Sequence, residues 1–283
     1  MILFVGLGLI GGSMAKALRG FEGMRALCVD RDPHTREAAL CEGVVEAAYA
    51  DAAQAPVERA DVIVLCLHPQ GCVDFLRAHG ARVKPGALVT DVCGVKRPVF
   101  EAARAYLTPG AHFVGGHPMA GKEHGGYDNA TGSLFVGAHY ILVQEGGEDA
   151  QAVARVERMA RAMGCADVIR TDPLTHDLRV AYTSQMMHVL AVAICEQDAL
   201  EDSYGFEGGS FRGTTRVAAL DPDLWTELFW PNRDALAQVT EELIGKLQDY
   251  AALLRGGERE ALRARLAAAS ARKEAYNRAN RTR

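Results

Sequence analysis

The sequence predicts an α/β protein in which a doubly wound, mostly parallel sheet over residues 1–171 is followed by an all-helical domain over residues 172–283. Three observations lead to this prediction. Short apolar runs alternate with helical patterns through the first part, as they do in βαβ units. One run, Asp61 to Leu67, is nearly continuous, as is typical of a strand buried on both faces. After Arg170 the strand patterns end and long helical patterns follow.

The composition limits the classes of protein to consider. The 283 residues suffice for two domains, and a hydrophobic fraction of 49% indicates a packed core rather than disorder. The net charge of -5, from 31 basic and 36 acidic residues, disfavours nucleic acid as a partner. Seven cysteines without a CxxC pair suggest reduced thiols in a cytoplasmic protein, without a disulfide framework or a metal site.

No membrane segment is expected. The first strand begins at Ile2, which leaves no room for a signal peptide. We also expect no apolar run close to the ~20 residues that span a bilayer.

A glycine loop follows the first strand, Ile2 to Val5, and precedes a helix. Its GxGxxG pattern lies between a strand and a helix, the context that dinucleotide binding requires. Gly6 permits the tight turn, Gly8 lets a pyrophosphate approach the backbone, and Gly11 allows close packing of helix and strand. The pattern predicts a Rossmann-type domain. The expected cofactor-binding residues of the loop are Gly6, Gly8, Leu9, Ile10 and Gly11.

An acidic residue completes this motif. The second strand, Met24 to Val29, ends at Asp30, nineteen residues after Gly11. A carboxylate there accepts hydrogen bonds from ribose hydroxyls and repels a 2′-phosphate, which favours NAD over NADP. Arg31 leaves NADP open, because an arginine at this place can hold that phosphate. A glycine turn with a surface aspartate is the disfavoured alternative.

The rest of the sheet domain continues the alternation. Strands are expected at 61–67, 87–90, 112–115, 140–143 and 168–170, with helices at 33–42, 69–79, 99–106 and 150–163. Ligands of such sheets bind beyond the carboxyl ends of the strands. The segment Asp91 to Lys96 lies at such an end, and we expect Asp91 and Gly94 to bind the cofactor. Cys93 is interpreted as a packing residue rather than a reactive thiol.

A glycine-rich segment, residues 115–126, supplies the candidate base. His117 precedes Pro118, which favours extended backbone, so this histidine is expected at the end of a strand. A histidine held there can act as a general base near neutral pH. An incidental histidine in a glycine-rich turn explains the segment alone equally well.

The helical part contains two further candidate sites. A long helix is expected from Asp172 to Ala199, apolar all round from Met186 onward and therefore buried in a core or an interface. His188 shares a face with Asp177, Ala181 and Ser184 and is either a pocket residue or a buried histidine bonded to one of them. Further helices are expected from 221, over 232–254 and over 258–283.

Two arginines follow among glycines and hydroxyl residues. Arg212 and Arg216 are four residues apart, and guanidinium groups bind carboxylates in bidentate fashion. Taken alone, solvated surface arginines explain the pair as well. Because the helical part has no strands, we expect it to pack against the sheet domain and against a second copy of itself.

Taken together, these motifs resemble those of the prephenate dehydrogenase family, the TyrA-type or cyclohexadienyl dehydrogenases. The segments HPMAG and FRGTTRVA are specific to it, whereas many dehydrogenases share the glycine loop. The matching segments, in order, are 6–13, 91–96, 115–121, 134–135, 176–177, 184–188, 211–218 and 221–225.

The resemblance implies NAD-dependent oxidative decarboxylation of prephenate to 4-hydroxyphenylpyruvate, in tyrosine biosynthesis. It implies that His117 contacts the ring hydroxyl and takes its proton while hydride leaves for nicotinamide. Loss of carbon dioxide then aromatises the ring. Arg216 is implied to bind a substrate carboxylate, which suits a dianionic substrate. A homodimer through the helical domain is expected.

Further site residues also follow from the resemblance. His188 and Trp225 match active-site residues of the family. Gly94 stands where many relatives have a serine near the nicotinamide. Gln185 replaces a family histidine and is expected to donate a hydrogen bond to substrate. Lys122 is also expected to bind substrate; alternatively, in the absence of that serine and of the replaced histidine, a water or Lys122 orients the catalytic histidine.

Three alternatives remain at this stage. Arogenate dehydrogenase has the same fold and chemistry, with an amino group on its substrate in place of the keto group. A β-hydroxyacid or 6-phosphogluconate-type dehydrogenase is disfavoured, because no lysine occurs between Asp172 and Leu200 to serve as its catalytic lysine. A non-catalytic NAD-sensing module would need the glycine loop but neither His117 nor Arg216.

Overall fold

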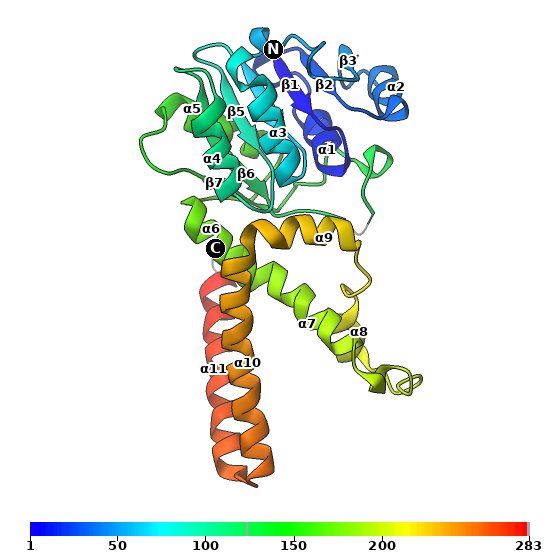
Figure 1. Ribbon diagram of the computed structural model, residues 1–283, viewed down its shortest axis with the longest axis vertical. Coiled ribbons are helices and arrows are strands. Elements are labelled where there is room, and N and C mark those ends of the chain that lie inside the picture. The colour runs from blue at the N-terminus through cyan, green and yellow to red at the C-terminus, as the bar shows by residue number, and fades with distance from the viewer. Residues whose placement is uncertain (123, 282–283) are drawn as a thin grey trace. The chain divides into compact units, whose positions relative to one another are not determined.

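The structure is a computed structural model that describes residues 1–122 and 124–281. It consists of two compact units, Met1–Arg233 and Asp234–Arg283. The first unit contains the sheet and the helices that adjoin it (Figure 1).

The first unit is built on one eight-stranded sheet with strand order β3-β2-β1-β4-β5-β6-β7-β8. Neighbouring strands pair in parallel, except that β6 and β7 are antiparallel. This topology confirms the predicted fold class. The strands are β1 Ile2–Val5, β2 Ala26–Val29, β3 Ala47–Tyr49, β4 Val62–Leu65, β5 Leu88–Asp91, β6 His112–Pro118, β7 His139–Val143 and β8 Asp167–Thr171.

Helices cover both faces of the sheet. On one face α1 and α5 pack with Ile2 and Phe4 of β1 in one apolar core. On the other face α3 and α4 pack with Leu3 and Val5 in a second core. Successive side chains of a strand point to opposite faces, so a strand buried on both sides is apolar throughout. The helices are α1 Leu9–Ala17, α2 Pro33–Cys41, α3 Pro69–His79, α4 Arg97–Tyr106 and α5 Ala150–Ala162.

One strand was not predicted. β3 has three half-buried residues, Ala47 to Tyr49, and contains no β-branched side chain. It forms because its backbone pairs with β2 at the edge of the sheet. Local propensity therefore did not indicate it.

The long helix after the sheet is interrupted. It comprises α6 Pro173–Val180, a π-helical turn Ala181–Gln185 and α7 Met186–Cys195, so it ends four residues before the predicted Ala199. Asp172 caps its start by accepting a hydrogen bond from the backbone N–H of Thr175, at 2.9 Å.

The sequence was expected to hold no membrane-spanning run, but residues 173–195 are long and apolar enough to cross a membrane, by a criterion that core helices of soluble proteins also meet. Only 28% of the apolar window is buried. Two short helices, α8 Gly209–Thr215 and α9 Pro222–Phe229, complete the first unit.

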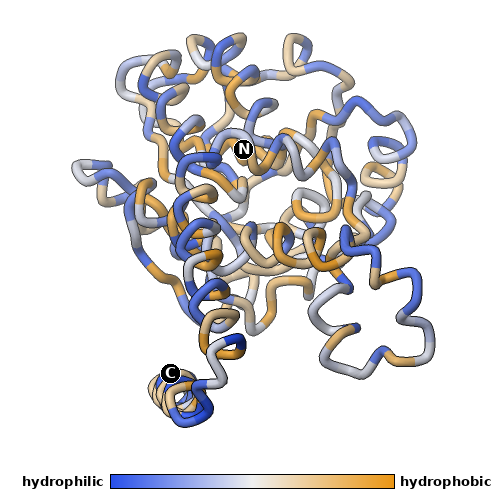
Figure 2. Tube along the Cα trace, turned by 60° about the horizontal axis from the view of Figure 1, so that its bottom comes forward, coloured by the Kyte–Doolittle hydropathy of each residue, from blue (hydrophilic) through white to orange (hydrophobic). Residues whose placement is uncertain are grey.

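The second unit is a helical hairpin. α10, Arg233–Arg255, and α11, Arg259–Arg281, are joined at Gly256 and Gly257, the latter with φ of +66°. An ion pair of 2.7 Å between Arg265 and Asp249 links the two helices. In Figure 2 the helix bearing the C-terminus carries both hydrophobic and hydrophilic residues along its turns. Apolar side chains exposed on this hairpin are Ile244, Leu247, Leu254, Leu266 and Tyr276.

Candidate active site

The glycine loop after β1 has the geometry of a phosphate site. Gly6 has φ of +89°, and a Cβ there would lie 2.6 Å from the carbonyl oxygen of Cys66. A Cβ at Gly11 would lie 2.0 Å from the carbonyl oxygen of Gly6. At Gly8, by contrast, no described atom lies within 4 Å of an added Cβ. The backbone is therefore accessible where α1 begins, and the first N–H groups of that helix can donate hydrogen bonds to a bound anion.

Asp30 lies directly beside this loop. Its Oδ2 accepts a hydrogen bond of 2.7 Å from the backbone N–H of Leu7, and its Oδ1 accepts one of 2.9 Å from Asp32. Arg31 is exposed at the same corner. The arrangement holds the Asp30 carboxylate at the end of β2, where a ribose would lie if a dinucleotide occupied the loop.

His117 is held by a chain of two more side chains. Its Nδ1 lies 3.0 Å from Nε2 of His176, and Nδ1 of His176 lies 2.8 Å from Oδ1 of Asp177. An ionised carboxylate only accepts, so a neutral His176 donates from Nδ1 and accepts at Nε2. His117 must then donate from its Nδ1. Its Nε2 is therefore unprotonated and available as a base.

Both histidines are held neutral by their surroundings. Burial, the adjoining His176 and the positive charge of Lys96 hold the pKa of His117 well below its usual value of 6.5. Burial also lowers the pKa of His176, against the opposing effect of the hydrogen bond that His176 donates to Asp177. A neutral imidazole near pH 7 is the form that a general base requires.

Asp91 lies beneath the site rather than on its surface. Its side chain is fully buried, and its oxygens accept hydrogen bonds from the backbone N–H groups of Cys93 at 3.0 Å and Gly116 at 3.2 Å. It also pairs with the ammonium group of Lys96. The protein therefore closes off this carboxylate, and cofactor binding by Asp91 stays a prediction that only its backbone can meet.

The neighbouring Gly94 does lie beside the candidate base. A Cβ added there would be 3.9 Å from Cε1 of His117 and 3.9 Å from Cδ2 of Leu228. The site therefore has room for a small side chain at this position.

Cys93 fits the packing interpretation. Its Sγ lies 3.3 Å from Sγ of the buried Cys72. That contact and burial raise the pKa of the Cys93 thiol well above its usual value, so the thiolate is disfavoured.

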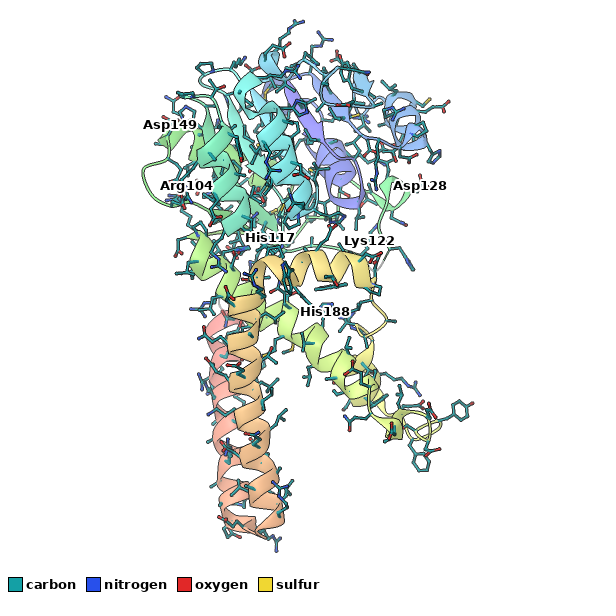
Figure 3. All side chains as sticks on the ribbon, in the orientation of Figure 1. Arg104, His117, Lys122, Asp128, Asp149 and His188 are labelled. Atoms are coloured by element: carbon teal, nitrogen blue, oxygen red, sulfur yellow. The ribbon has the colours of Figure 1, made fainter. Side chains whose placement is uncertain are left out.

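His188 and Trp225 lie together. Their ring centroids are 3.6 Å apart, with an interplanar angle of 30°. His188 Nδ1 lies 3.1 Å from the carbonyl oxygen of Ser184, so this nitrogen donates and Nε2 can accept. Figure 3 shows His117 at the strand ends that lie nearest α7 and α9, and His188 on α7.

The side chain of Gln185 is enclosed by the protein. Its side chain is 2% exposed, its amide donates to the carbonyl oxygen of Leu228 at 3.0 Å, and its oxygen accepts from Asn232 at 2.8 Å. Asn232 also donates to the carbonyl oxygen of Asp177, at 2.9 Å. Gln185 thus ties the end of α9 to the helix that carries His176, and its contact with a substrate stays a prediction.

The remaining predicted residues are exposed. Lys122 donates a hydrogen bond of 2.7 Å to the carbonyl oxygen of Asn129. Its predicted alternative role, orienting the base, is filled by His176 in this structure. Arg216 follows the last residue of α8. Its contact with a substrate carboxylate stays a prediction.

Sequence reasoning assigned no role in orienting the base to His176, Asp177 or Lys96. The signal for the first two was an adjacent histidine and aspartate one turn after the cap at Asp172. For Lys96, the signal was a lysine within a segment otherwise apolar enough to be buried.

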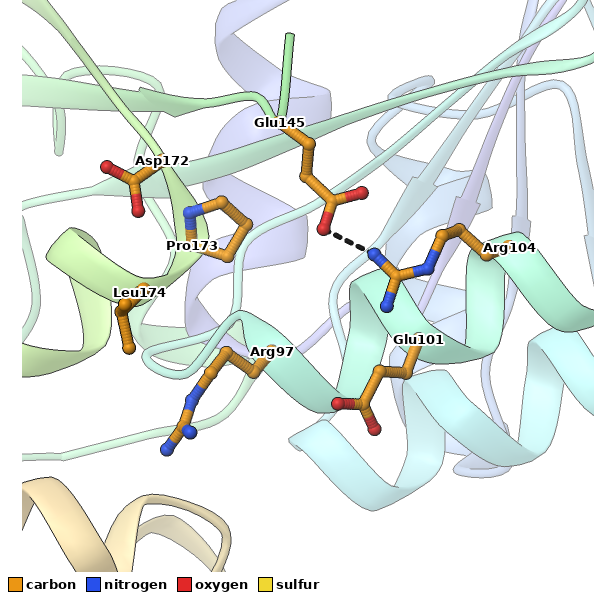
Figure 4. Close-up of a pocket in the computed structure, with 7 residues that line it drawn as sticks. All are labelled: Arg97, Glu101, Arg104, Glu145, Asp172, Pro173 and Leu174. Atoms are coloured by element: carbon orange, nitrogen blue, oxygen red, sulfur yellow. Dashed lines mark hydrogen bonds and ion pairs between the residues drawn. The ribbon is translucent and has the colours of Figure 1, made fainter.

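A separate hollow of about 330 Å³ lies beside α4 and the start of α6 (Figure 4). Arg97 reaches from it to the side chains that adjoin His117, with its Nε 3.4 Å from Oδ2 of Asp177. Arg104 pairs with Glu145 across it. Both arginines of the hollow are therefore already paired with carboxylates. The lining residues are Arg97, Glu101, Arg104, Glu145, Asp172, Pro173 and Leu174.

The sequence of the chain matches family models and known proteins. Residues 14–169 match the family model described as "Prephenate dehydrogenase, nucleotide-binding domain", and residues 172–268 match "Prephenate dehydrogenase, dimerization domain". Prephenate dehydrogenase of Bacillus subtilis is 30% identical over 252 residues, which are 87% of this chain and 68% of that protein.

Two solved structures are similar over almost the whole chain. Arogenate dehydrogenase of Synechocystis is 29% identical, with a TM-score of 0.84 over 97% of this chain and 99% of that one. Prephenate dehydrogenase of A. aeolicus, solved with hydroxyphenyl propionate and NAD+, is 26% identical, with a TM-score of 0.86 over 97% of each chain. With both family models matched in order, the chain belongs to the prephenate dehydrogenase family.

Proposed function

We propose that this protein is an NAD-dependent prephenate dehydrogenase that converts prephenate to 4-hydroxyphenylpyruvate by oxidative decarboxylation, in tyrosine biosynthesis. The observation that carries the proposal is the His117–His176–Asp177 chain, which leaves His117 Nε2 unprotonated beside Gly94. Family membership supplies the reaction class.

The chain's residues account for the proton transfer. His117 Nε2 takes the proton of the ring hydroxyl as the hydrogen on the same carbon leaves as hydride, and the proton stays on the imidazole. NAD, when bound, accepts the hydride. The resulting ketone is conjugated with both ring double bonds and takes up, at its oxygen, the electron pair of the bond to the ring carboxylate as that bond breaks. Carbon dioxide leaves, the ring becomes an aromatic phenolate, and the imidazole of His117 then returns its proton to the phenolate oxygen.

The cofactor is proposed to lie over the glycine loop. Its pyrophosphate would meet the backbone of Gly8, Leu9 and Ile10, where the loop is open. Gly6 and Gly11 shape the turn, and their missing side chains make the close approach possible. Asp30 would bind the ribose, which favours NAD, with Arg31 beside it. Gly94 would lie near the nicotinamide.

The substrate is proposed to be held from the helical part, residues 172–283, which we assign as the substrate-binding and dimerisation domain beside the NAD-binding domain, residues 1–171. Arg216 would bind a carboxylate, because its charge persists at every working pH. His188 and Trp225 would line the ring site, with Lys122 at its entrance.

Arogenate is the second candidate substrate. It differs from prephenate by an amino group in place of the keto group, and one of the similar structures is an arogenate dehydrogenase. The proposed contacts act on the ring hydroxyl and the carboxylates, which both compounds share. A non-catalytic NAD-binding module is disfavoured, because it would not need the ordered base.

The deciding experiment follows NADH formation with prephenate and, separately, with arogenate. We expect His117→Asn to abolish most turnover, since asparagine cannot take the proton, whereas NAD affinity persists. His112→Asn, at the other end of β6, is the matched control and should retain activity. Undiminished turnover in His117→Asn would remove this residue from the mechanism, and NAD binding without turnover of either compound would favour the sensing module.

We also propose that the protein acts as a homodimer in the cytoplasm, with no nucleic acid or membrane as partner. The seven cysteines are all unpaired, as expected of a reducing compartment. The family model over residues 172–268 is described as a dimerization domain.

A further inference from the structure

A buried lysine lies directly behind the candidate base. The side chain of Lys96 is fully buried, and its ammonium group donates to Oδ2 of Asp91 and to the carbonyl oxygen of Gly116. Gly116 immediately precedes His117. A buried charge is costly unless it is paired and hydrogen-bonded, and both conditions hold here.

The lysine and aspartate together hold both polar backbone groups of Gly116. The ammonium group of Lys96 donates a hydrogen bond to the carbonyl oxygen, and Oδ1 of Asp91 accepts one from the N–H at 3.2 Å. Side-chain space is absent at this point, because a Cβ on Gly116 would lie 2.0 Å from the hydroxyl of Tyr140. The backbone that carries His117 is thereby held at one position.

The same lysine residue also anchors the other end of the imidazole chain. Its backbone N–H donates to Oδ1 of Asp177 at 2.8 Å. The same oxygen accepts a hydrogen bond from Nδ1 of His176. His176 in turn meets His117. The contacts therefore close a ring that runs from Gly116 through the three side chains and back to Lys96.

We propose that Lys96, paired with Asp91, is a positioning residue that fixes both the backbone and the imidazole partner of His117. The inference rests on the proposed function, since it takes His117 to be the base. In this inference the buried ion pair serves to orient the base and not to raise the free energy of unfolding. Replacing a buried ion pair with apolar residues is often neutral or stabilising.

The charge of Lys96 has a second effect in the same direction. It contributes, after burial, to lowering the pKa of His117 and of His176. The lysine therefore favours the neutral ring as well as its placement. Both effects should be lost when the charge is removed.

The test compares three variants with wild type. Lys96→Met removes the charge, and Lys96→Met/Asp91→Asn removes both charges, so that no unpaired carboxylate remains buried if the single variant fails to fold. The matched control is Lys84→Met, which breaks another lysine–aspartate pair, 2.6 Å to Asp61, at the opposite ends of the strands.

In the Lys96 variants we expect kcat with prephenate to fall roughly 100-fold, as misplacement of a catalytic group does. KM and the affinity for NAD should change less than about threefold, since no binding group is removed. Lys84→Met should match wild type. The proposal would be overturned if the loss of activity came from a higher KM, a lower affinity for NAD or thermal unfolding of the variant. An unchanged kcat in the folded double variant would also overturn it.

An NMR titration gives a readout that needs no turnover. The imidazole signals of His117, assigned by their loss in His117→Asn, should titrate at a higher pH in the double variant than in wild type. In wild type, nitrogen shifts should show protonated Nδ1 on both His117 and His176. The opposite tautomer, or an unmoved titration, would overturn the positioning role even if prephenate proves not to be the substrate.

Discussion

His117 meets its surroundings through two nitrogens with different tasks. Nδ1 is committed to His176, so only Nε2 is available to a reacting hydroxyl. This division follows from Asp177. Because its carboxylate accepts a hydrogen bond from His176, it determines which nitrogen of each imidazole carries the proton. The carboxylate therefore orients a base that it does not touch.

The lowered pKa values of His117 and His176 predict how stability depends on pH. Below about pH 6.5 the histidines of the unfolded chain take up protons, whereas these two remain neutral in the folded state until lower pH. The unfolding free energy should therefore fall with decreasing pH, by at most about 1.4 kcal/mol per pH unit for each histidine. Urea denaturation between about pH 7.5 and 5.5 measures the slope. His117→Asn should flatten it, and an equal slope in both proteins would contradict the assignment.

Arg216 supports a prediction about substrate affinity. Arg216→Ala should raise the KM for prephenate roughly 10- to 100-fold, because a charged hydrogen bond contributes about 1.5–3 kcal/mol. Steady-state kinetics with saturating NAD provide the measurement. Arg212→Ala is the matched control, since that exposed arginine donates to the carbonyl oxygen of Glu207. A loss of NAD affinity in place of a KM effect would put Arg216 in a different site.

At the scale of elements, the sequence predicted what local patterns encode. The strand–glycine loop–helix unit and the continuous apolar strands follow from burial and from the steric demands at Gly6 and Gly11. Tertiary contacts determined the rest. β3 depends on pairing with β2, and no periodicity indicates the extra residue in the π-helical turn.

The same distinction applies to the candidate site. His117 could be identified because glycine and proline flank it, and these act on the local backbone. Its partner His176 lies 59 residues later and meets it only through packing of α6 against the sheet domain. Gln185 was expected to bind substrate only because it stands where the resembling family has a histidine, and nothing in the sequence indicated that Asn232 and Leu228 occupy both ends of its amide.

For the whole molecule, uncovered apolar surface bears on the assembly state. In α7 only Met186 and Ala191 are buried, although nearly every residue of this helix is apolar. Met187 and Tyr182 are 39% and 60% exposed. An apolar surface of this kind is typical of a subunit interface.

We therefore expect the wild-type protein to sediment at twice the mass of one chain, which is 30.4 kDa. Ala193→Glu, on the exposed side of α7, should shift the population to single chains because it would bury an unpaired charge. Glu196→Gln, just beyond the helix, is the control and should leave the mass unchanged. Sedimentation of wild type as a single chain would contradict the dimer.

The π-helical turn between α6 and α7 has a consequence for how two histidines are aimed. Twelve residues separate His176 from His188, and at about 100° per residue a regular helix would point them some 120° apart. A π turn takes in one extra residue, which reduces the effective separation to about eleven residues, or three complete turns. Both imidazoles then project from one side of the rod. Removing a single residue from Ala181–Gln185 would leave the rings eleven regular helical residues apart and keep them on the same side, whereas inserting one more residue would swing the second ring away by about 100°.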